Sequence, residues 1–204
     1  MAVHMSRPGD GVGIEVVHQT IPQPNGTTLR TAGLNLSTAP VPDRRYAADL
    51  ATVLYKHEVL RLVFAQETIS SISPTLRSML IVNMAPGAAR NFLRSLQQLS
   101  PTLDELAEKN GIEPGPLFNV ESEPGQTIAL AANLAAVAII GRDACIDFFQ
   151  ASPFAMAKIG SARMIPVDPV VRVDVRTSLL LSLRNAIQKL EGNFPPEIVE
   201  VLQE

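Results

Sequence analysis

The apolar residues of this chain follow two different periods, and their order predicts a structural unit. In residues 59–66, Leu60, Leu62 and Phe64 alternate with other positions, which is the period-2 pattern of a strand. Residues 79–84 are almost continuously apolar, as in a strand that is buried on both faces. Pro86 suits the first position of a helix, and apolar residues recur at helical spacing as far as residue 99. The pattern therefore predicts a strand, strand, helix unit.

The same unit is predicted a second time in the C-terminal half. A shift of 84 residues, without a gap, places Ala48, Leu50, Ala51, Val53, Phe64 and Gln66 on Ala132, Leu134, Ala135, Val137, Phe148 and Gln150. After a loop that is seven residues longer in the second half, the shift becomes 91, with Val82, Gln97 and Leu99 on Val173, Gln188 and Leu190. We therefore predict an α+β fold built from a duplicated β-β-β-α unit, with antiparallel sheets and one amphipathic helix in each repeat.

The first repeat is predicted to begin with two strands, at 49–56 and 59–66, joined by a tight turn at His57 and Glu58. Residues 68–78 are rich in Ser and Thr, and this composition predicts a loop that leads to the third strand.

The second repeat is predicted to have strands at 129–140, 144–150 and 170–175, with an enlarged loop at 151–169 before the last strand. Thr177 or Ser178 is expected to cap the following helix, and Gly192 to end it in the left-handed conformation.

Other signals mark the boundaries of these repeats. Residues 14–21 and 29–36 have strand character and flank an Asn-Gly turn signal, which predicts an N-terminal hairpin. A Pro-rich and acidic stretch near residue 112 indicates a linker between the halves. The predicted organisation is an N-terminal arm and hairpin at 1–45, the first repeat at 46–111, a linker at 112–126, and the second repeat with a C-terminal tail at 127–204.

The composition of the chain argues against several classes of partner. The net charge is −3 with scattered Lys and Arg, which does not favour binding to the phosphates of a nucleic acid. No apolar run reaches the roughly 18 residues that cross a bilayer, so no membrane association is expected. A single cysteine, Cys145, excludes an intrachain disulfide, and no secretory signal is visible at the N-terminus. A cytoplasmic protein is therefore expected.

Residues 64–66, 79–86 and 88–98 together resemble a small prokaryotic family of unknown function, in which a strand leads into Met-Ser-Pro and an Ala-rich helix. The match covers residues 46–104, with a second copy at 129–193, and Ala85 replaces the usual Ser. Residues 82–98 are also similar to the end of the SecB export chaperone, where Asn-Leu-Ala-Pro leads into a helix, although that chaperone is not a tandem duplication. The resemblance to SecB implies a sheet-and-helix fold that oligomerises and holds extended polypeptide in apolar grooves.

No combination of residues predicts catalysis, a metal site or a cofactor. His57 and Glu58 are adjacent in a turn, where successive side chains point in opposite directions, so an acid–base pair is not expected. Cys145 lies between Asp143 and Asp147 on one predicted strand face, and neighbouring carboxylates raise the pKa of a thiol instead of activating it. The histidines are dispersed, which does not favour zinc.

The strongest candidate for a binding site is an apolar segment in a region whose Gly, Pro and Ser content predicts a loop. An apolar loop can lie at a partner site or cover the core as a lid, and these two interpretations are evenly balanced. Leu181 is expected off the buried face of its helix, and Arg90 and Arg94 are expected at the rim of the site. The predicted partner-binding residues are Phe148, Phe149, Phe154, Met156, Ile159, Met164, Ile165, Leu181, Arg90 and Arg94.

Three functions are compatible with these observations. The leading hypothesis is a non-enzymatic, chaperone-like module that holds an apolar segment of a partner protein, without a cofactor. The first alternative is a structural subunit of a homo-oligomeric assembly, since oligomerisation would cover an unpaired sheet edge. The second alternative is an enzyme whose site is assembled from dispersed residues.

Overall fold

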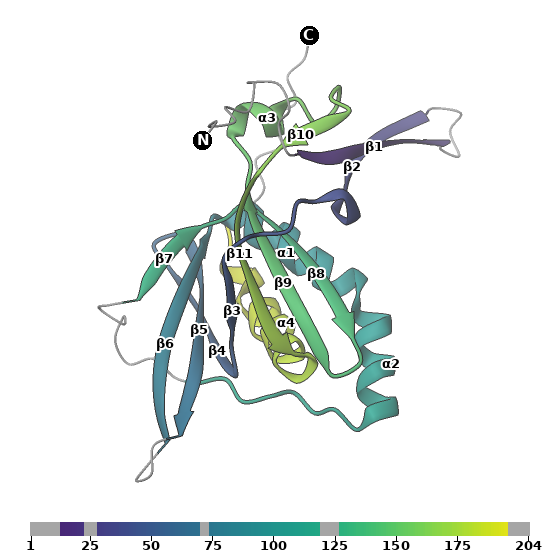
Figure 1. Cartoon of the computed structure of the whole chain (residues 1–204). Coiled ribbons are helices and arrows are strands. Elements are labelled where there is room, and N and C mark those ends of the chain that lie inside the picture. The colour runs from purple at the N-terminus through teal and green to yellow at the C-terminus, as the bar shows by residue number, and fades with distance from the viewer. Residues whose placement is uncertain (1–12, 23–27, 70–73, 119–126, 196–204) are drawn as a thin grey trace, which may run out of the picture.

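The computed structural model describes residues 13–22, 28–69, 74–118 and 127–195, and it confirms the α+β fold (Figure 1). The helices are α1 (Pro86–Gln98), α2 (Ser100–Asn110), α3 (Pro153–Ala157) and α4 (Thr177–Leu190), with short 3-10 turns η1 (Leu36–Thr38) and η2 (Glu191–Asn193). The strands are β1 (Gly13–Pro22), β2 (Thr28–Asn35), β3 (Arg45–Ala47), β4 (Leu50–Lys56), β5 (Val59–Ile69), β6 (Pro74–Met84), β7 (Ile128–Ala131), β8 (Leu134–Ile140), β9 (Asp143–Gln150), β10 (Met164–Pro166) and β11 (Asp168–Arg176).

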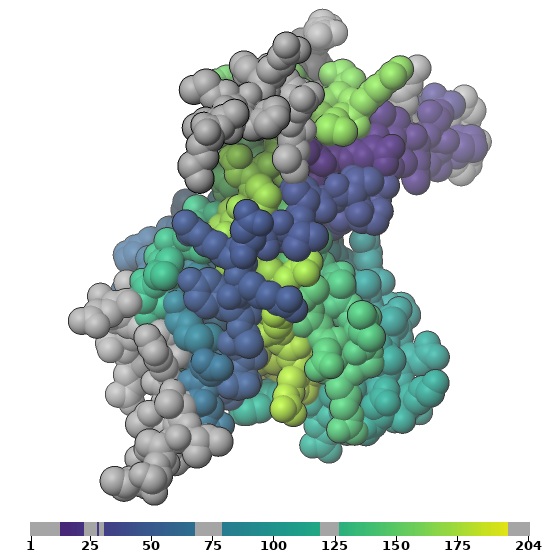
Figure 2. All heavy atoms as spheres, in the orientation of Figure 1, coloured from purple at the N-terminus to yellow at the C-terminus, as the bar shows by residue number. Residues whose placement is uncertain are grey.

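These strands form three sheets. The first sheet has the order β4-β5-β6-β7, and the second sheet has the order β3-β11-β9-β8. A third, smaller sheet has the order β10-β1-β2 and includes the predicted N-terminal hairpin, whose turn at 23–27 lies outside the described residues. We call this smaller sheet together with α3 the hairpin layer. It lies at one end of the two larger sheets, and β1 and β2 project from the body (Figures 1 and 2).

The turn between β4 and β5 follows the prediction, whereas the loop expected at 68–78 was wrong. His57 and Glu58 both have positive φ, as a two-residue turn with right-handed strand twist requires. Beyond it, β5 and β6 stay paired as far as Ile69 and Pro74, so strand replaces most of the expected loop. The Ser and Thr residues of this stretch are compatible with strand because Thr has a high β-propensity and ladder pairing outweighs composition.

The strand expected at 129–140 is two strands that belong to different sheets. The segment changes sheets at Ala132 and Asn133. Before this point β7 pairs with β6 of the first sheet, and after it β8 pairs with β9 of the second sheet. A matching bend at Ala48 and Asp49 separates β3, in the second sheet, from β4, in the first. Each bent segment therefore adds a short parallel strand to one sheet and an antiparallel strand to the other.

Hydrogen bonds at the two bends correspond to one another. Ala48 N–H donates to the Asp174 carbonyl at 2.9 Å, and Ala132 N–H donates to the Asn83 carbonyl at 3.0 Å. The ladders correspond as well: Leu50 pairs with Ala65 in the first sheet, and Leu134 pairs with Phe149 in the second, each residue 84 positions later. The two sheets thus share strand order and register, while the duplication itself stays a prediction from the sequence.

One aliphatic core joins the two larger sheets to α1 and α4. Phe148 of the second sheet lies 6.2 Å from Phe64 of the first sheet and 6.0 Å from Phe92 of α1, measured between ring centroids. Each helix contacts the first antiparallel strand of the other half, α1 against β8 and α4 against β4. The halves consequently share their core.

The helix ends follow the predictions in part. Pro86 occupies the first turn of α1, as predicted. Gly111 ends α2 with a φ of 60°, which glycine adopts without strain.

Both expectations for α4 were wrong. Arg176 is the N-cap residue and makes no capping hydrogen bond through its side chain, since the Thr177 hydroxyl donates to the Gly141 carbonyl at 2.9 Å instead. At the other end, α4 continues into η2 instead of ending in a left-handed residue at Gly192. Within the described residues, no helix has the length and apolar composition needed to cross a membrane.

We expect Asn133→Ala to destabilise the protein by about 2 kcal/mol, because it removes two hydrogen bonds and leaves buried polar groups without partners. Asn133 Nδ2 donates to the Ala151 carbonyl at 2.7 Å, its Oδ1 accepts from Ala151 N–H at 2.8 Å, and Ala151 is fully buried. Urea denaturation measures the loss. Asp49→Ala is the matched control at the other bend, where the exposed carboxylate accepts from Glu67 N–H at 3.2 Å, and a loss below about 1 kcal/mol is expected. Equal losses of stability in the two variants would contradict the expectation that Asn133 stabilises its bend more than Asp49 stabilises the other.

Candidate functional site

The predicted partner-binding residues separate into a buried and an exposed group. Phe148, Phe149, Ile165 and Leu181 are buried, so the expectation that they face a partner was wrong. Phe148 and Phe149 follow one another on β9 and point to opposite faces of the second sheet, and both faces are covered there. Phe148 packs in the shared core, whereas Phe149 packs with the buried residues of the hairpin layer.

Leu181 is buried because α4 is surrounded on more than one side. The helix contacts β4, α1, α2, β11 and β9. The segment 112–118 adds a further contact, since Gly115 N–H donates to the Ser178 carbonyl at 2.9 Å and Ser182 Oγ donates to the Gly115 carbonyl at 2.6 Å. Amphipathic spacing predicts that only one face of α4 is buried, whereas neighbours on several sides bury Leu181 as well.

The segment expected as a loop at 151–169 contains regular structure. Ser152 caps α3, with its side chain accepting from Ala155 N–H at 3.1 Å, and β10 pairs with β1. Phe154 is 83% exposed and Met164 is 54% exposed, while Met156 and Ile159 are half-buried against the core of the hairpin layer. Phe154 and Met164 are therefore the members of the predicted set that present most apolar surface.

Met164 is held in place by a close approach to the backbone of β1. A Cβ added to Gly13 would lie 2.6 Å from Met164 Cγ and 2.8 Å from the Ile165 carbonyl oxygen, so only glycine fits there. Met164 pairs with Glu15, which places it on the face of β1 that alternation also gives to Val17 and Ile21. Val17 and Ile21 are 39% and 42% exposed. This outward face of the hairpin layer extends the apolar surface.

Arg90 and Arg94 lie on α1, and the contacts given for them among the described residues are with residues outside the hairpin layer. Arg90 donates to the Pro195 carbonyl and stacks over Phe194, with Cζ 5.8 Å from the ring centroid. Arg94 donates to Asn91 Oδ1 at 3.3 Å on its own helix. Arg90 thus anchors the chain after α4, a role that sequence spacing did not indicate.

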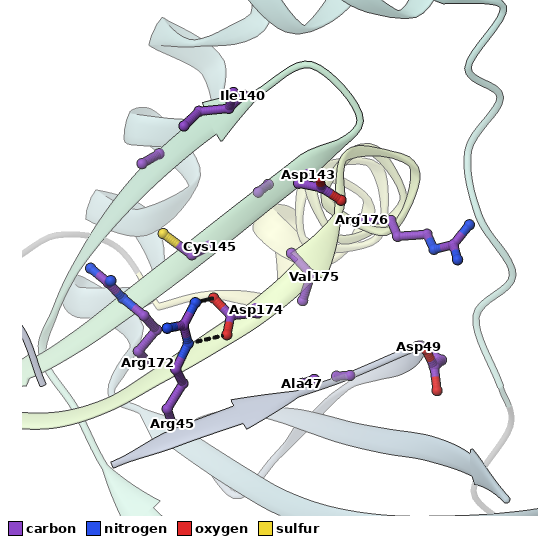
Figure 3. A pocket seen from close by; sticks show the side chains of 13 residues that line it. Arg45, Ala47, Asp49, Ile140, Asp143, Cys145, Arg172, Asp174, Val175 and Arg176 are labelled. Carbon is purple, nitrogen blue, oxygen red and sulfur yellow. Dashed lines mark hydrogen bonds and ion pairs between the residues drawn. The ribbon is translucent and has the colours of Figure 1, made fainter. Parts of the chain in front are cut away.

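A second candidate site lies on the outer face of the second sheet. A pocket of about 550 Å³ extends from β3 across β11 and β9 to β8 (Figure 3). Its floor includes alanine side chains and Ile140, and its polar groups include Arg45, Cys145, Arg172 and Asp174. The spacing along the sequence indicates Cys145 and its acidic neighbours but not the two arginines, which adjacent strands bring to the same face.

Two of the arginines at this pocket, Arg45 and Arg172, are paired with carboxylates. Arg172 Nε and Nη2 each donate to Asp147 at 2.6 Å, and both side chains are mostly buried. Arg45 makes two hydrogen bonds to the Asp174 carboxylate, as the dashed lines of Figure 3 show. Each carboxylate raises the pKa of its arginine, so both guanidinium groups stay charged.

Burial raises the pKa of the Cys145 thiol, and the Asp147 and Asp174 carboxylates raise it further, while Arg172 opposes them. A thiol held in its protonated form is a poor nucleophile. Asp147 therefore raises the pKa of the thiol, as its position beside Cys145 in the sequence predicts.

The remaining candidates are not assembled into a site. His57 and Glu58 are exposed in the β4–β5 turn, and His18 donates through Nε2 to the Ala162 carbonyl at 2.8 Å. Among the described residues, no group of three His, Cys, Asp or Glu side chains could hold a metal ion.

Comparison with known proteins found no matching family model, no matching curated protein and no matching solved structure. The resemblances to the prokaryotic family and to SecB therefore stay predictions from the sequence. Function has to be argued from the two surfaces described above, the hairpin layer and the outer face of the second sheet.

Removing either partner of the Arg172–Asp147 pair should destabilise the protein by about 3 kcal/mol, because the other charge is left buried without its partner. The first sheet has Val63 and Ile81 at the corresponding positions, where they pair directly. We expect the double variant Asp147→Val with Arg172→Ile to recover stability to within about 1 kcal/mol of the wild type. Urea denaturation of the two single variants and the double variant measures this coupling, and additive losses would show that the pair does not act as a unit.

Alkylation of Cys145 by iodoacetamide should be several-fold slower at pH 8 than in the urea-unfolded chain. The raised pKa lowers the fraction of reactive thiolate at that pH, and the midpoint of the rate profile should lie above the ordinary value of about 8.5. Because the folded thiol keeps a proton that the unfolded thiol has lost, this group also makes the fold less stable as the pH rises through that window. Equal alkylation rates in the folded and the unfolded chain would contradict a raised pKa for the Cys145 thiol.

Proposed function

We propose that the protein is a protein-binding, chaperone-like module that holds an extended apolar segment of a partner on the hairpin layer. The observation that carries this proposal is the gathering of exposed apolar side chains there. Eight large apolar residues of the described chain are clearly exposed. Half of them belong to this one small layer: Phe154, Met164, Val17 and Ile21. The core of the hairpin layer does not need these four side chains, because Ile14, Val16 and Ile165 form its buried cluster with Phe149.

An exposed apolar surface that the fold does not need is typical of a partner site. Phe154 and Met164 are a rigid aromatic and a flexible thioether, and methionine adapts to apolar partners of different shape. The strand β1 also offers an outward face on which a segment could lie across Val17 and Ile21. These features favour an extended, apolar ligand.

The charges of the layer narrow the chemistry of the partner. Between Phe148 and Pro166 the sequence contains Lys158 and Arg163 but no Asp or Glu, and both basic residues are exposed. Glu15 is engaged with Asn35, whose Nδ2 donates to it at 2.9 Å. A basic rim around apolar contacts fits a partner segment with acidic residues beside its apolar stretch.

A labelled peptide with alternating Leu and Thr and with Glu at both ends should bind the wild-type protein, and Phe154→Ser with Met164→Ser should weaken binding at least tenfold. Apolar anchors of an interface each contribute about 1–2 kcal/mol or more, which corresponds to this loss. Fluorescence anisotropy measures binding, and urea denaturation should show unchanged stability because both side chains are exposed.

Ile128→Ser with Ile140→Ser is the matched control, because these residues are 50% and 83% exposed, close to the 54% of Met164 and the 83% of Phe154, but lie outside the hairpin layer. It should bind like the wild type, and the same peptide with Lys at both ends should bind more weakly. Equal loss in the control pair, or no loss in the Phe154 and Met164 pair, would overturn the proposal.

A further inference from the structure

The outer edge of β8 is apolar and has no strand paired with it among the described residues. β8 is the last strand of the second sheet, and within the described part of the chain no strand or bridge pairs with its outer side. Its sequence, Leu-Ala-Ala-Val-Ala-Ile-Ile, contains no charge and no proline. Sheet edges in soluble proteins are normally protected by charges, prolines, bulges or a covering segment.

The register determines which backbone groups of β8 face outward. Ile140 and Asp143 close the two-residue turn to β9, so Ile140, Ala138 and Ala136 bond to β9. The intervening residues Ala135, Val137 and Ile139 therefore direct their N–H and C=O groups to the open edge. These three residues form a short row that is symmetric about Val137.

The corresponding strand of the first sheet shows how such an edge is covered. β4 lies at the edge of its sheet, and Ala51 of β4 forms a parallel bridge with Leu117. Phe118 N–H donates to the Ala51 carbonyl at 3.2 Å, which places the segment 112–118 along that edge. Ala135 is the counterpart of Ala51 in register; it is buried and α1 contacts β8, but no described strand or bridge takes the place of Leu117 beside it.

We infer that a second copy of this chain covers the β8 edge, through antiparallel pairing of β8 with β8 about a twofold axis at Val137. In this register Val137 pairs with its own copy and Ala135 pairs with Ile139 of the other chain, which satisfies all the outward groups of the row. No like charges meet, because the strand has none, and the small side chains of Ala135, Ala136 and Ala138 allow close approach. The two second sheets become one continuous eight-stranded sheet.

This inference does not rest on the proposed function, since none of the exposed residues assigned to partner binding belongs to β8. Dimerisation should be unaffected by Phe154→Ser with Met164→Ser. Peptide binding to the hairpin layer should likewise persist in a monomeric β8 variant.

Val137→Pro tests the pairing, because proline removes the outward N–H of Val137 and is tolerated where that group faces away from the strand's own sheet. The wild type should be a concentration-dependent dimer by light scattering, and Val137→Pro should weaken dimerisation at least tenfold. Val53→Pro is the matched control, since Val53 holds the same position in β4, is also half-buried against the shared core, and lies on the edge that the chain covers itself. It should dimerise like the wild type.

Amide hydrogen exchange on the wild type tests the β8–β8 pairing even if the proline variants do not fold. Ala135, Val137 and Ile139 N–H should be protected at high protein concentration and should lose protection on dilution. A monomer at all concentrations, or dimerisation that survives Val137→Pro, overturns the inference. Protection of these three amides that does not change on dilution also overturns it, because a segment of the same chain would then cover the edge.

Discussion

Two bends, at Ala48–Asp49 and Ala132–Asn133, tie the two larger sheets together. Each bend lets one continuous segment pair first with one sheet and then with the other, so neither sheet can be completed by its own half of the chain. Hydrogen bonds from Ala48 to Asp174 and from Ala132 to Asn83 fix the crossing points. Because the third strand of each sheet is thereby tied to the other half, the helices α1 and α4 are enclosed in a single core.

The two sheets use the same register for different chemistry on their outer faces. In the first sheet, Val63 and Ile81 pair as apolar neighbours and are buried. In the second sheet, Asp147 and Arg172 stand at the corresponding places and form a mostly buried ion pair, beside the pocket that also contains Arg45 and Cys145. The paired Arg172 guanidinium makes this face polar, and the raised pKa of the Cys145 thiol lowers its nucleophilicity.

The hairpin layer shows why local pattern alone was an incomplete guide to the binding surface. Phe148, Phe149, Phe154 and Met164 are all apolar residues of one stretch, yet two of them are in cores and two are exposed. The difference depends on β1 and β10, which come from distant parts of the chain and pair with each other over the end of the second sheet. This pairing buries Ile165 and leaves its neighbour Met164 outside, because adjacent strand residues point to opposite faces.

The elements whose signals are local could be predicted from the amino-acid sequence. The alternation of Leu60, Leu62 and Phe64, the turn at His57 and Glu58, and the helix that begins at Pro86 all follow from period and turn chemistry, and the structure confirms each of them. Tertiary structure alone decided where a strand changes sheet and which apolar residue is covered. The bend at Asn133 interrupts a continuous apolar run and is fixed by hydrogen bonds to Ala151, which is 18 residues away. Burial of Leu181 and pairing of Arg172 with Asp147 likewise depend on neighbours that only the folded chain brings together, and a one-dimensional pattern does not contain that information.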